Sequence, residues 1–208
     1  MNNFLGYAVV DIETNGLDPE RNRILEIASV GLRPDLSVEG TWSTLINPET
    51  PCMGRTDIHG LRTEDVIMAP TFADIAGDLI AALRGRILVA HHVDFDAGFL
   101  SEEFERAGHL ISFPTIPAID TLDLARQRWP YLGASLRSCC QRVGILTSAE
   151  HSALGDAWST ALLLQHLLAH IIPSTRAELD LASRKATLVK WPVVPCDIVP
   201  PVLRKAFP

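Results

Sequence analysis

The chain has 208 residues, of which 47% are hydrophobic, and it carries a formal net charge of -7 at pH 7. This length suits one domain with a sizeable core and is too short for two domains of ordinary size. The acidic balance excludes a broad basic surface for nucleic acid, although a pair of bound divalent cations would offset part of the charge and focus positive charge at one site.

The segment from Tyr7 to Leu17, YAVVDIETNGL, is predicted to be a buried strand that ends at two carboxylates. Its residues Ala8–Val10 are typical of a strand covered on both faces, and Asn15-Gly16 predicts the following turn. Because side chains alternate along a strand, Asp11 and Glu13 are expected on one face. For these two residues alone a solvated strand end is the simpler interpretation, and a divalent-metal site requires further carboxylates elsewhere.

Two further strands are predicted before the first long helix. The segments Arg23–Leu32 and Gly40–Ile46 have the pattern of strands, and their short connections predict an antiparallel meander. The segment Pro48–Pro70 has little periodicity apart from a short helix that Thr63 would cap. Thr71 is the expected N-cap of a helix that ends near residue 85.

A second apolar strand also delivers polar residues to its end. Ile87–Ala90 runs directly into HHVDFD, and a helix is predicted from about Ala97 to Ala107. In open α/β sheets, ligands bind outside the carboxyl ends of the strands. We therefore expect the ends of these two strands to form one site.

The remaining chain is predicted to be mostly helical, which completes an α/β fold. Its mixed central sheet of about five strands, an antiparallel meander followed by parallel strands, is flanked by helices. We predict one domain at residues 1–172, and a C-terminal short helix with a proline-rich extended tail at residues 173–208. The elements expected after residue 117 are a short strand at Ala118–Thr121 and helices at Leu122–Trp129, Ser135–Val143, Asp156–His170 and Ser174–Lys185.

Composition also limits location and thiol chemistry. No apolar run approaches the roughly 20 residues of a spanning helix, and the N-terminal residues lack the basic n-region of a signal peptide. We predict a cytoplasmic protein with no membrane partner. The four cysteines lack a Cys-x-x-Cys motif, so neither a disulfide framework nor a zinc ribbon is indicated.

Four carboxylates and one histidine are the candidates for a catalytic centre. Asp96, after the fourth strand, and Asp156, near the start of the last long helix, join Asp11 and Glu13. Mg²⁺ and Mn²⁺ prefer oxygen ligands, and two such ions can clamp both oxygens of a phosphoryl displacement. His151, five residues before Asp156, is a group that can accept a proton near neutral pH.

Three motifs in this order resemble the DEDDh 3′-to-5′ exonucleases, the family of the proofreading epsilon subunit of bacterial DNA polymerase III, RNase T and oligoribonuclease. The resemblance covers about residues 5–170 and implies an RNase H-like fold. Each motif alone is weak, but three at compatible spacing are specific. The motifs are VVDIETNGL at Val9–Leu17, HHVDFDAGFL at His91–Leu100 and HSALGDA at His151–Ala157.

The resemblance implies a role for each candidate residue. Asp11, Glu13 and Asp156 would ligate two Mg²⁺ or Mn²⁺ ions, with Asp11 as the bridge, and Asp96 would bind the second ion directly or through water. His151 would be the general base that activates water. The implied reaction is hydrolysis of the terminal phosphodiester of single-stranded DNA or RNA, which releases nucleoside 5′-monophosphates.

The resemblance also implies substrate contacts, although the second motif departs from the family pattern. Thr14 and Leu17 would lie beside the 3′-terminal nucleotide, and Phe95 is a further candidate. His59 is as well explained by a turn residue that packs on the sheet as by a substrate contact. The second motif has His92 where relatives often have Asn, and it contains Asp94. We interpret Asp94 as a solvated residue of the strand-to-helix turn; the alternative, if it shares a face with Asp96, is that it competes for the second ion or tunes its affinity.

Three polar residues near these motifs are interpreted as structural: Glu26, His91 and Asp120.

A non-catalytic nucleic-acid-binding or polymerase-accessory module of the same fold is the alternative to an enzyme. Such a module would have no physical reason to keep four repelling carboxylates together. A DNA polymerase subunit is a possible partner, and the choice between DNA and RNA, or between proofreading and trimming, is open.

Overall fold

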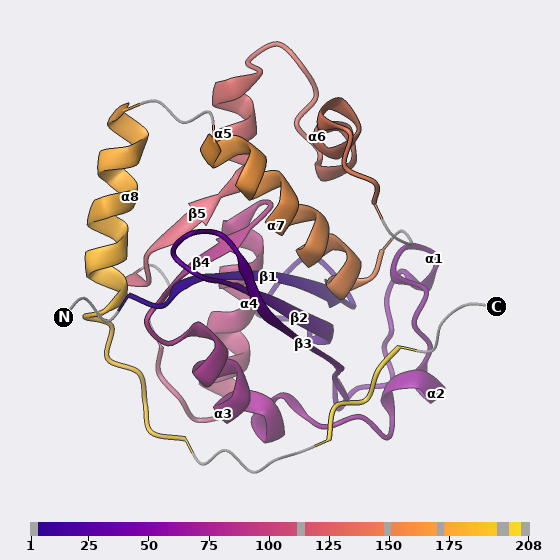
Figure 1. Ribbon diagram of the computed structural model, residues 1–208. Helices are drawn as coiled ribbons and strands as arrows, with labels where there is room; N and C mark the ends of the chain where they lie inside the picture. The colour runs from indigo at the N-terminus through magenta and orange to yellow at the C-terminus, as the bar shows by residue number, and fades with distance from the viewer. Residues whose placement is uncertain (1–3, 112–114, 148–150, 170–172, 195–199, 205–208) are drawn as a thin grey trace.

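The computed structural model describes residues 4–111, 115–147, 151–169, 173–194 and 200–204 (Figure 1). Within these ranges five β-strands form one sheet in the order β3-β2-β1-β4-β5. β2 is antiparallel to β1 and β3, whereas β4 is parallel to β1 and β5, which confirms the predicted meander followed by parallel strands. The strands are β1 (Gly6–Thr14), β2 (Ile24–Leu32), β3 (Val38–Leu45), β4 (Arg86–Ala90) and β5 (Ala118–Asp120).

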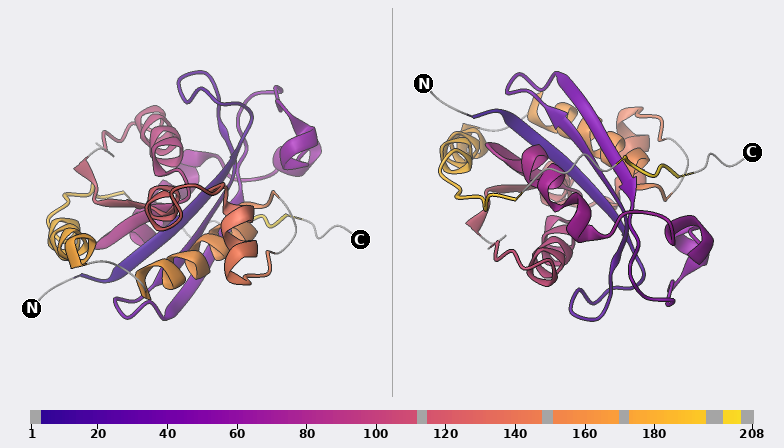
Figure 2. Two further views of the ribbon diagram at one scale, coloured as in Figure 1. Left: turned by 90° about the horizontal axis from the view of Figure 1, so that it is seen from above. Right: turned by 90° about the horizontal axis from the view of Figure 1, so that it is seen from below.

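Helices cover both faces of this sheet. α3 and α4 pack on one face and α7 and α8 on the other, so the strands lie between two helical layers (Figure 2). In the described residues the helices are α1 (Thr56–His59), α2 (Thr63–Val66), α3 (Phe72–Leu83), α4 (Val93–Arg106), α5 (Thr121–Arg128), α6 (Leu136–Val143), α7 (Ala153–Ala169) and α8 (Pro173–Ala186).

Alternation along β1 divides the core between the two layers. Val10 packs with Phe104 of α4 on one face, and Val9 packs with Leu164 and Leu168 of α7 on the other. Burying a side chain of this kind stabilises a fold by about 1.5–3 kcal/mol. The two layers therefore hold β1 in place from both sides, and its carboxyl end is rigidly supported.

α4 and α7 begin four and three residues earlier than predicted, for reasons that lie in their caps. α4 begins at Val93 because the carboxylate of Asp120, on β5, accepts hydrogen bonds from the backbone N–H groups of His92 (3.0 Å) and Val93 (3.2 Å). α7 begins at Ala153, where the hydroxyl of the preceding Ser152 accepts from an N–H of the first turn. The cap of α4 comes from a distant strand, so local periodicity did not reveal it.

Residues 200–204 of the tail are extended and lie against the end of β3, an outer strand of the sheet. The N–H of Leu45, at the end of β3, donates to the carbonyl of Val202 (2.7 Å), and the N–H of Val202 donates to the hydroxyl of Thr44 (3.1 Å). Val202 also packs on a small apolar cluster that includes Leu25 and Leu61. The proposed division of the chain at residue 172 stays a prediction.

Two further predictions concern membrane-spanning helices and the cysteines. In the ranges that the structure covers, no helix is both long and apolar enough to cross a membrane; the cytoplasmic location stays a prediction. Cys139 and Cys140 are buried thiols and Cys52 is exposed, whereas Cys196 lies outside the described residues.

Candidate active site

The carboxyl end of β1 presents two acids to one side of the sheet. Ile12 points into the core between them, so Asp11 and Glu13 share the opposite face, as predicted. Asp156, in the first turn of α7, meets them there. One ligand oxygen from each of these three carboxylates lies within 4.8 Å of the others. This spacing suits a cation, since oxygens of three carboxylates approach so closely at little cost only around positive charge.

Asp96 adds a fourth carboxylate from the first turn of α4. It is only 5% exposed and is hydrogen-bonded by the backbone of Ile12, and its charge is the largest electrostatic influence of any side chain on Asp11. The structure thus brings Asp96, rather than Asp94, to the acidic cluster.

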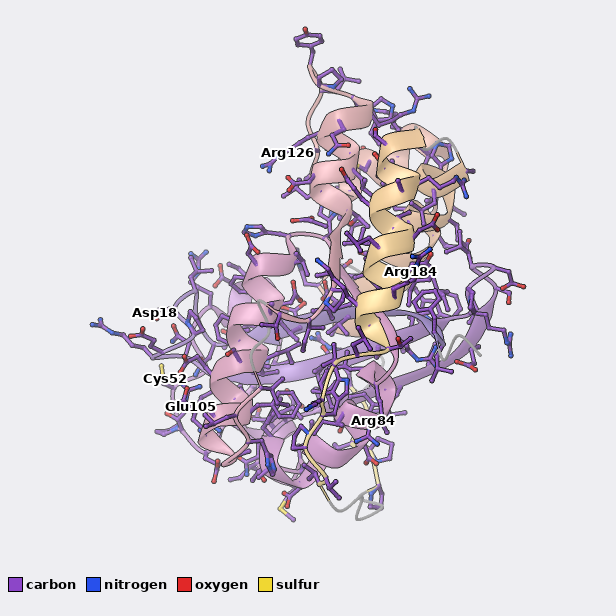
Figure 3. The ribbon with its side chains drawn as sticks, turned by 90° about the vertical axis from the view of Figure 1, so that its left-hand side faces the viewer. Asp18, Cys52, Arg84, Glu105, Arg126 and Arg184 are labelled. Atoms are coloured by element: carbon purple, nitrogen blue, oxygen red, sulfur yellow. The ribbon has the colours of Figure 1, made fainter. Side chains whose placement is uncertain are left out.

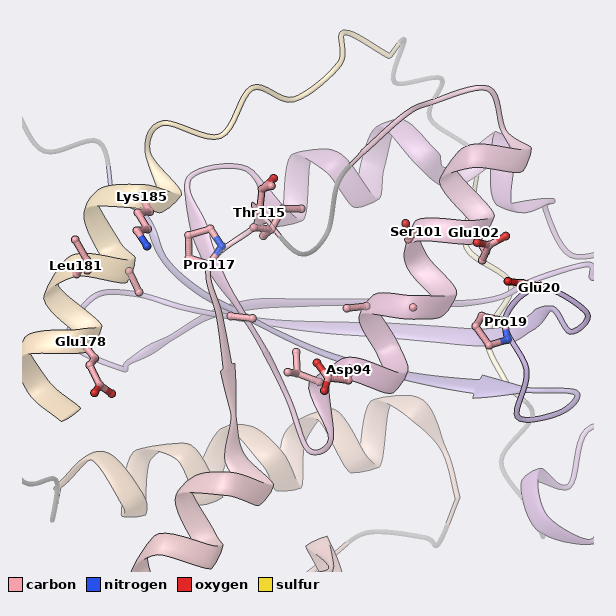
Figure 4. A pocket seen from close by; sticks show the side chains of 16 residues that line it. Pro19, Glu20, Asp94, Ser101, Glu102, Thr115, Pro117, Glu178, Leu181 and Lys185 are labelled. Atoms are coloured by element: carbon pink, nitrogen blue, oxygen red, sulfur yellow. The ribbon is translucent and has the colours of Figure 1, made fainter. Parts of the chain in front are cut away.

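Asp94 is exposed and points into a separate groove of about 770 Å³ between α4 and α8 (Figure 4). Acidic side chains dominate the charges of this groove, so it would repel the phosphates of a nucleic acid. Asp94 is solvent-exposed, as interpreted from the sequence, but it lies in the first turn of α4 rather than in the turn before the helix. The charged residues that line the groove are Glu20, Asp94, Glu102, Glu178 and Lys185.

Burial and mutual repulsion raise the pKa values of three of these carboxyls. Burial raises the pKa of Asp11 well above its usual range, and the charges of Asp96, Asp156 and Glu13 raise it further. Burial likewise raises the pKa of Asp96. Burial and the charge of Glu26 raise the pKa of Glu13 to about 7. In the protein alone these groups favour protons, and a divalent cation would replace the protons and relieve the repulsion.

The donor set therefore fits hard divalent cations such as Mg²⁺ and Mn²⁺. All of the ligating atoms are carboxylate oxygens, which such ions prefer, and several carboxylates supply the negative charge that a pair of ions would need. Asp11, Glu13, Asp96 and Asp156 are the residues that would hold them.

His151 lies in the loop that precedes α7, two residues before its first turn. Its side chain is exposed, and its backbone adopts a left-handed conformation with φ of 58°. Left-handed φ values are uncommon outside glycine, so the chain turns sharply at this point before it enters the helix of Asp156. The structure places His151 at the solvent side of this helix start.

Two polar residues hold the second motif in position. The ring of His91 bonds through Nδ1 to the hydroxyl of Thr121 (2.9 Å) and through Nε2 to the carbonyl of Ala134 (2.8 Å). Asp120 receives the backbone N–H groups of the turn between β4 and α4, as described above. Both residues are structural, as predicted from the sequence, and together they fix the helix start that carries Asp96.

The four predicted substrate contacts have different surroundings in the structure, and the roles of Thr14, Leu17 and Phe95 stay predictions. Leu17 is 85% exposed beyond the end of β1, the Thr14 hydroxyl donates to the carbonyl of Gly16 (2.7 Å), and Phe95 is half-buried in the first turn of α4. His59 is only 2% exposed, and both ring nitrogens are bonded within the protein, to the Met53 carbonyl (2.8 Å) and the Leu61 N–H (3.1 Å). The substrate role for His59 is therefore corrected, because its ring closes a turn.

Arg204 is a residue of the site that sequence reasoning missed. Its guanidinium donates to Oε2 of Glu26 through Nη2 (2.7 Å) and Nε (3.1 Å), and Glu26 lies directly opposite Glu13 across the β1–β2 ladder. The charge of Arg204 lowers the pKa of Glu13, whereas burial and the charge of Glu26 raise it. The two partners of this ion pair are separated by 178 positions, and a proline-rich tail offered no signal that it would return to the sheet.

Comparison with known proteins identifies relatives of the chain. The model of an exonuclease family, RNase T, matches residues 8–164. The PolC-type DNA polymerase III of Oceanobacillus iheyensis is 32% identical over 168 residues, which cover 80% of this chain and 12% of that polymerase. The chain thus spans about an eighth of the length of the curated relatives that it resembles.

Solved structures agree with this family. Exonuclease X in complex with 5′ overhanging duplex DNA is 27% identical with a TM-score of 0.62, covering 79% of this chain and 92% of that one. The nuclease domain of 3′hExo, described as a DEDDh family member, is 18% identical with a TM-score of 0.65 at the same coverage, and it shares the predicted RNase H-like fold. Because the family model matches more than half of its residues, the chain belongs to the RNase T exonuclease family.

Proposed function

We propose that the protein is a 3′-to-5′ exonuclease that hydrolyses the terminal phosphodiester of single-stranded DNA or RNA and releases nucleoside 5′-monophosphates. The observation that carries this proposal is the meeting of the Asp11, Glu13 and Asp156 carboxylates within 4.8 Å. With Asp96 beside them, they supply the ligands for two Mg²⁺ or Mn²⁺ ions. A non-catalytic module is disfavoured because these repelling acids destabilise the fold unless they bind cations.

The resemblance to the DEDDh exonucleases supports a role for each residue. When bound, the two ions supply charge stabilisation for the attacking and leaving oxygens. His151, on the exposed loop before α7, accepts the proton of the attacking water. Leu17 packs on the 3′-terminal base, and Phe95 supports the same nucleotide from the α4 side. The backbone of Thr14 faces the terminal sugar, while its hydroxyl stays in the turn.

A positively charged segment beside the acids supports a path for the nucleic-acid strand. The sequence from Leu124 to Thr147, here named the arginine arm, contains four arginines and no Asp or Glu in a chain of net charge -7. His91 attaches its Ala134 to the end of β4, the strand that leads to Asp96. Phosphates of the strand behind the scissile bond would be attracted to this arm. Its arginines are Arg126, Arg128, Arg137 and Arg142.

The relatives support a nucleic-acid end as the substrate and leave its type open. Exonuclease X was solved with overhanging duplex DNA and 3′hExo with rAMP, and the curated relatives are polymerases. We propose that the protein trims or proofreads 3′ ends, with a DNA polymerase subunit as a possible partner.

The test uses 5′-labelled single-stranded DNA and RNA oligonucleotides of matched sequence. Incubation with Mn²⁺ or Mg²⁺ should shorten them from the 3′ end one nucleotide at a time, and EDTA should abolish the reaction. Mononucleotides should be the products from the first turnover. Absence of metal-dependent shortening on every DNA and RNA substrate would reject the enzyme and favour a binding module. The ratio of the DNA and RNA rates identifies the preferred sugar.

A further inference from the structure

We propose that Arg204 is a positioning residue of this active site: it neutralises Glu26 and thereby holds Glu13 and the start of α7 in the arrangement that binds the divalent ions. The inference rests on the proposed function for its kinetic readout. Metal binding tests it independently of any activity.

The first step of the argument is that the tail which carries Arg204 is anchored. Val202 bonds to the end of β3 through both its N–H and its carbonyl, and its side chain packs on the apolar cluster of Leu25 and Leu61. Arg204 itself donates through Nη1 to the carbonyl of His59 (2.8 Å). Three hydrogen bonds and an apolar contact therefore present the guanidinium to the sheet in one orientation.

The second step concerns what Glu26 touches. Its Oε2 accepts both hydrogen bonds of Arg204 and also lies 3.3 Å from the backbone N–H of Ala153, the first residue of α7. Glu26 is thus bonded at once to the tail and to the helix that carries Asp156. Its position opposite Glu13 in the β1–β2 register puts the same carboxylate beside a proposed metal ligand.

The third step concerns charge. Glu26 is only 4% exposed, and a buried carboxylate that loses its cationic partner is strongly unfavourable. Without Arg204, Glu26 would repel Glu13 across the ladder, and it would relieve the repulsion by rotating toward the cations as an extra acid. This rotation loosens its contact with Ala153. Arg204 holds Glu26 away from the ions, and so keeps the ligand set to four acids.

The test begins with Arg204→Gln in the full chain, with Mn²⁺ binding measured by calorimetry alongside kcat and KM. We expect Mn²⁺ affinity and kcat to fall by about 10- to 100-fold, as is usual for partners of metal ligands, with KM for the oligonucleotide unchanged. Arg62→Gln is the matched control, because it removes one exposed arginine that pairs with exposed Glu64, and it should leave both quantities unchanged.

A double variant separates neutralisation of Glu26 from every other role. Glu26→Gln combined with Arg204→Gln removes the charge that needs a partner, so the double variant should regain most of the Mn²⁺ affinity that the single variant loses. Val202→Asp, which should detach the tail from its apolar cluster, should behave like Arg204→Gln, and Arg204→Lys should recover part of the loss.

The outcomes are distinct. Unchanged or tighter Mn²⁺ binding by Arg204→Gln overturns the proposal, and so does a double variant as weak as the single one. A rise in KM alone would also overturn it, because it would make Arg204 a substrate-phosphate contact. If the wild type binds Mn²⁺ but cleaves no oligonucleotide, the proposed function fails while the calorimetric comparison still decides the role of Arg204.

Discussion

At the scale of single residues, the site is a group of acids whose repulsion only cations or protons relieve. The pKa values of Asp11 and Asp96 are raised mainly by burial, and that of Glu13 is raised to about 7. His151 differs from them because it is exposed and lies on a loop. These differences separate the residues that we propose bind cations from the residue that we propose accepts a proton.

The raised pKa of Glu13 should make the stability of the metal-free protein and its affinity for Mn²⁺ change in opposite directions with pH. Its folded pKa of about 7 exceeds the ordinary value of 4.5, so the metal-free folded protein binds more protons than the unfolded chain between these values. Stability in EDTA should therefore decrease as the pH rises from 4.5 to 7. Mn²⁺ affinity should increase over the same range, because bound cations require the deprotonated carboxylate. Thermal unfolding across this pH range, with EDTA and with Mn²⁺, measures the stability of the metal-free protein and its stabilisation by the cation. A melting temperature in EDTA that does not change with pH would contradict the raised pKa of Glu13.

Replacement of His151 should affect chemistry and leave cation binding largely intact. His151→Ala removes only the proton acceptor, so kcat should fall by about 10²- to 10⁴-fold, while Mn²⁺ binding by calorimetry stays near that of the wild type. Asp11→Ala removes a proposed bridging ligand and should abolish both. Equal loss of Mn²⁺ binding in the two variants would refute the role given to His151.

At the scale of elements, the site depends on where two helices begin. α4 carries Asp96 and α7 carries Asp156, and each starts at a cap that lies next to a proposed metal ligand. Asp120 is the cap for two helices at once, since it also accepts the N–H of Leu122 in α5 (2.8 Å). Displacement of a helix start by a fraction of an ångström would therefore reach the carboxylates.

Asp120→Ala tests this dependence. It removes the acceptor of three backbone N–H groups, so the free energy of unfolding should fall by about 1–2 kcal/mol, and kcat should fall as well because Asp96 moves. Thr71→Ala is the matched control, since Thr71 caps α3 away from the acids. It should lower stability by a similar amount, measured by urea unfolding, with unchanged kcat. A stability loss without a rate loss in Asp120→Ala would show that the cap does not position Asp96.

The same scale shows what could be predicted from the sequence and what could not. Strand alternation correctly put Asp11 and Glu13 on one face, and apolar runs that stop at polar residues located two strand ends. The contacts of Asp120 and Arg204 join segments far apart in the chain, and no local period or propensity encodes them. His59 was uncertain because a histidine in a turn has the same sequence signature whether its ring faces the substrate or, as here, the interior.

At the scale of the whole molecule, charge is unevenly distributed. The net charge is -7, yet the arginine arm contains no acid. Arg126 projects outward from α5, at some distance from Asp18 and Glu105, which lie lower in the same view (Figure 3). A nucleic-acid strand is therefore expected to approach over the arm rather than over the rest of the surface.

Substitutions in the arm should weaken substrate binding and leave chemistry intact. Arg126→Gln with Arg128→Gln removes two exposed charges, so KM should rise several-fold at low salt. The dependence of log KM on log salt concentration should also become less steep, by about 0.7 for each phosphate that is no longer neutralised. Arg84→Gln, on the side opposite the arm, is the control and should change neither. Steady-state kinetics between 25 and 200 mM salt, roughly the range over which such charges are screened, measures the effect. If the dependence of KM on salt is unchanged, the nucleic-acid strand does not bind along the arginine arm.

The pairing of the tail with β3 has a further consequence for assembly. β3 is an outer strand of the sheet, and the carbonyl of Val202 accepts the backbone N–H of Leu45 at the end of β3 that leads into the apolar cluster. An outer strand with unpaired backbone groups is a template for another chain to add to. Molecules in which the tail has been detached or cleaved would therefore expose that template, and we expect them to self-associate edge to edge while the intact protein does not.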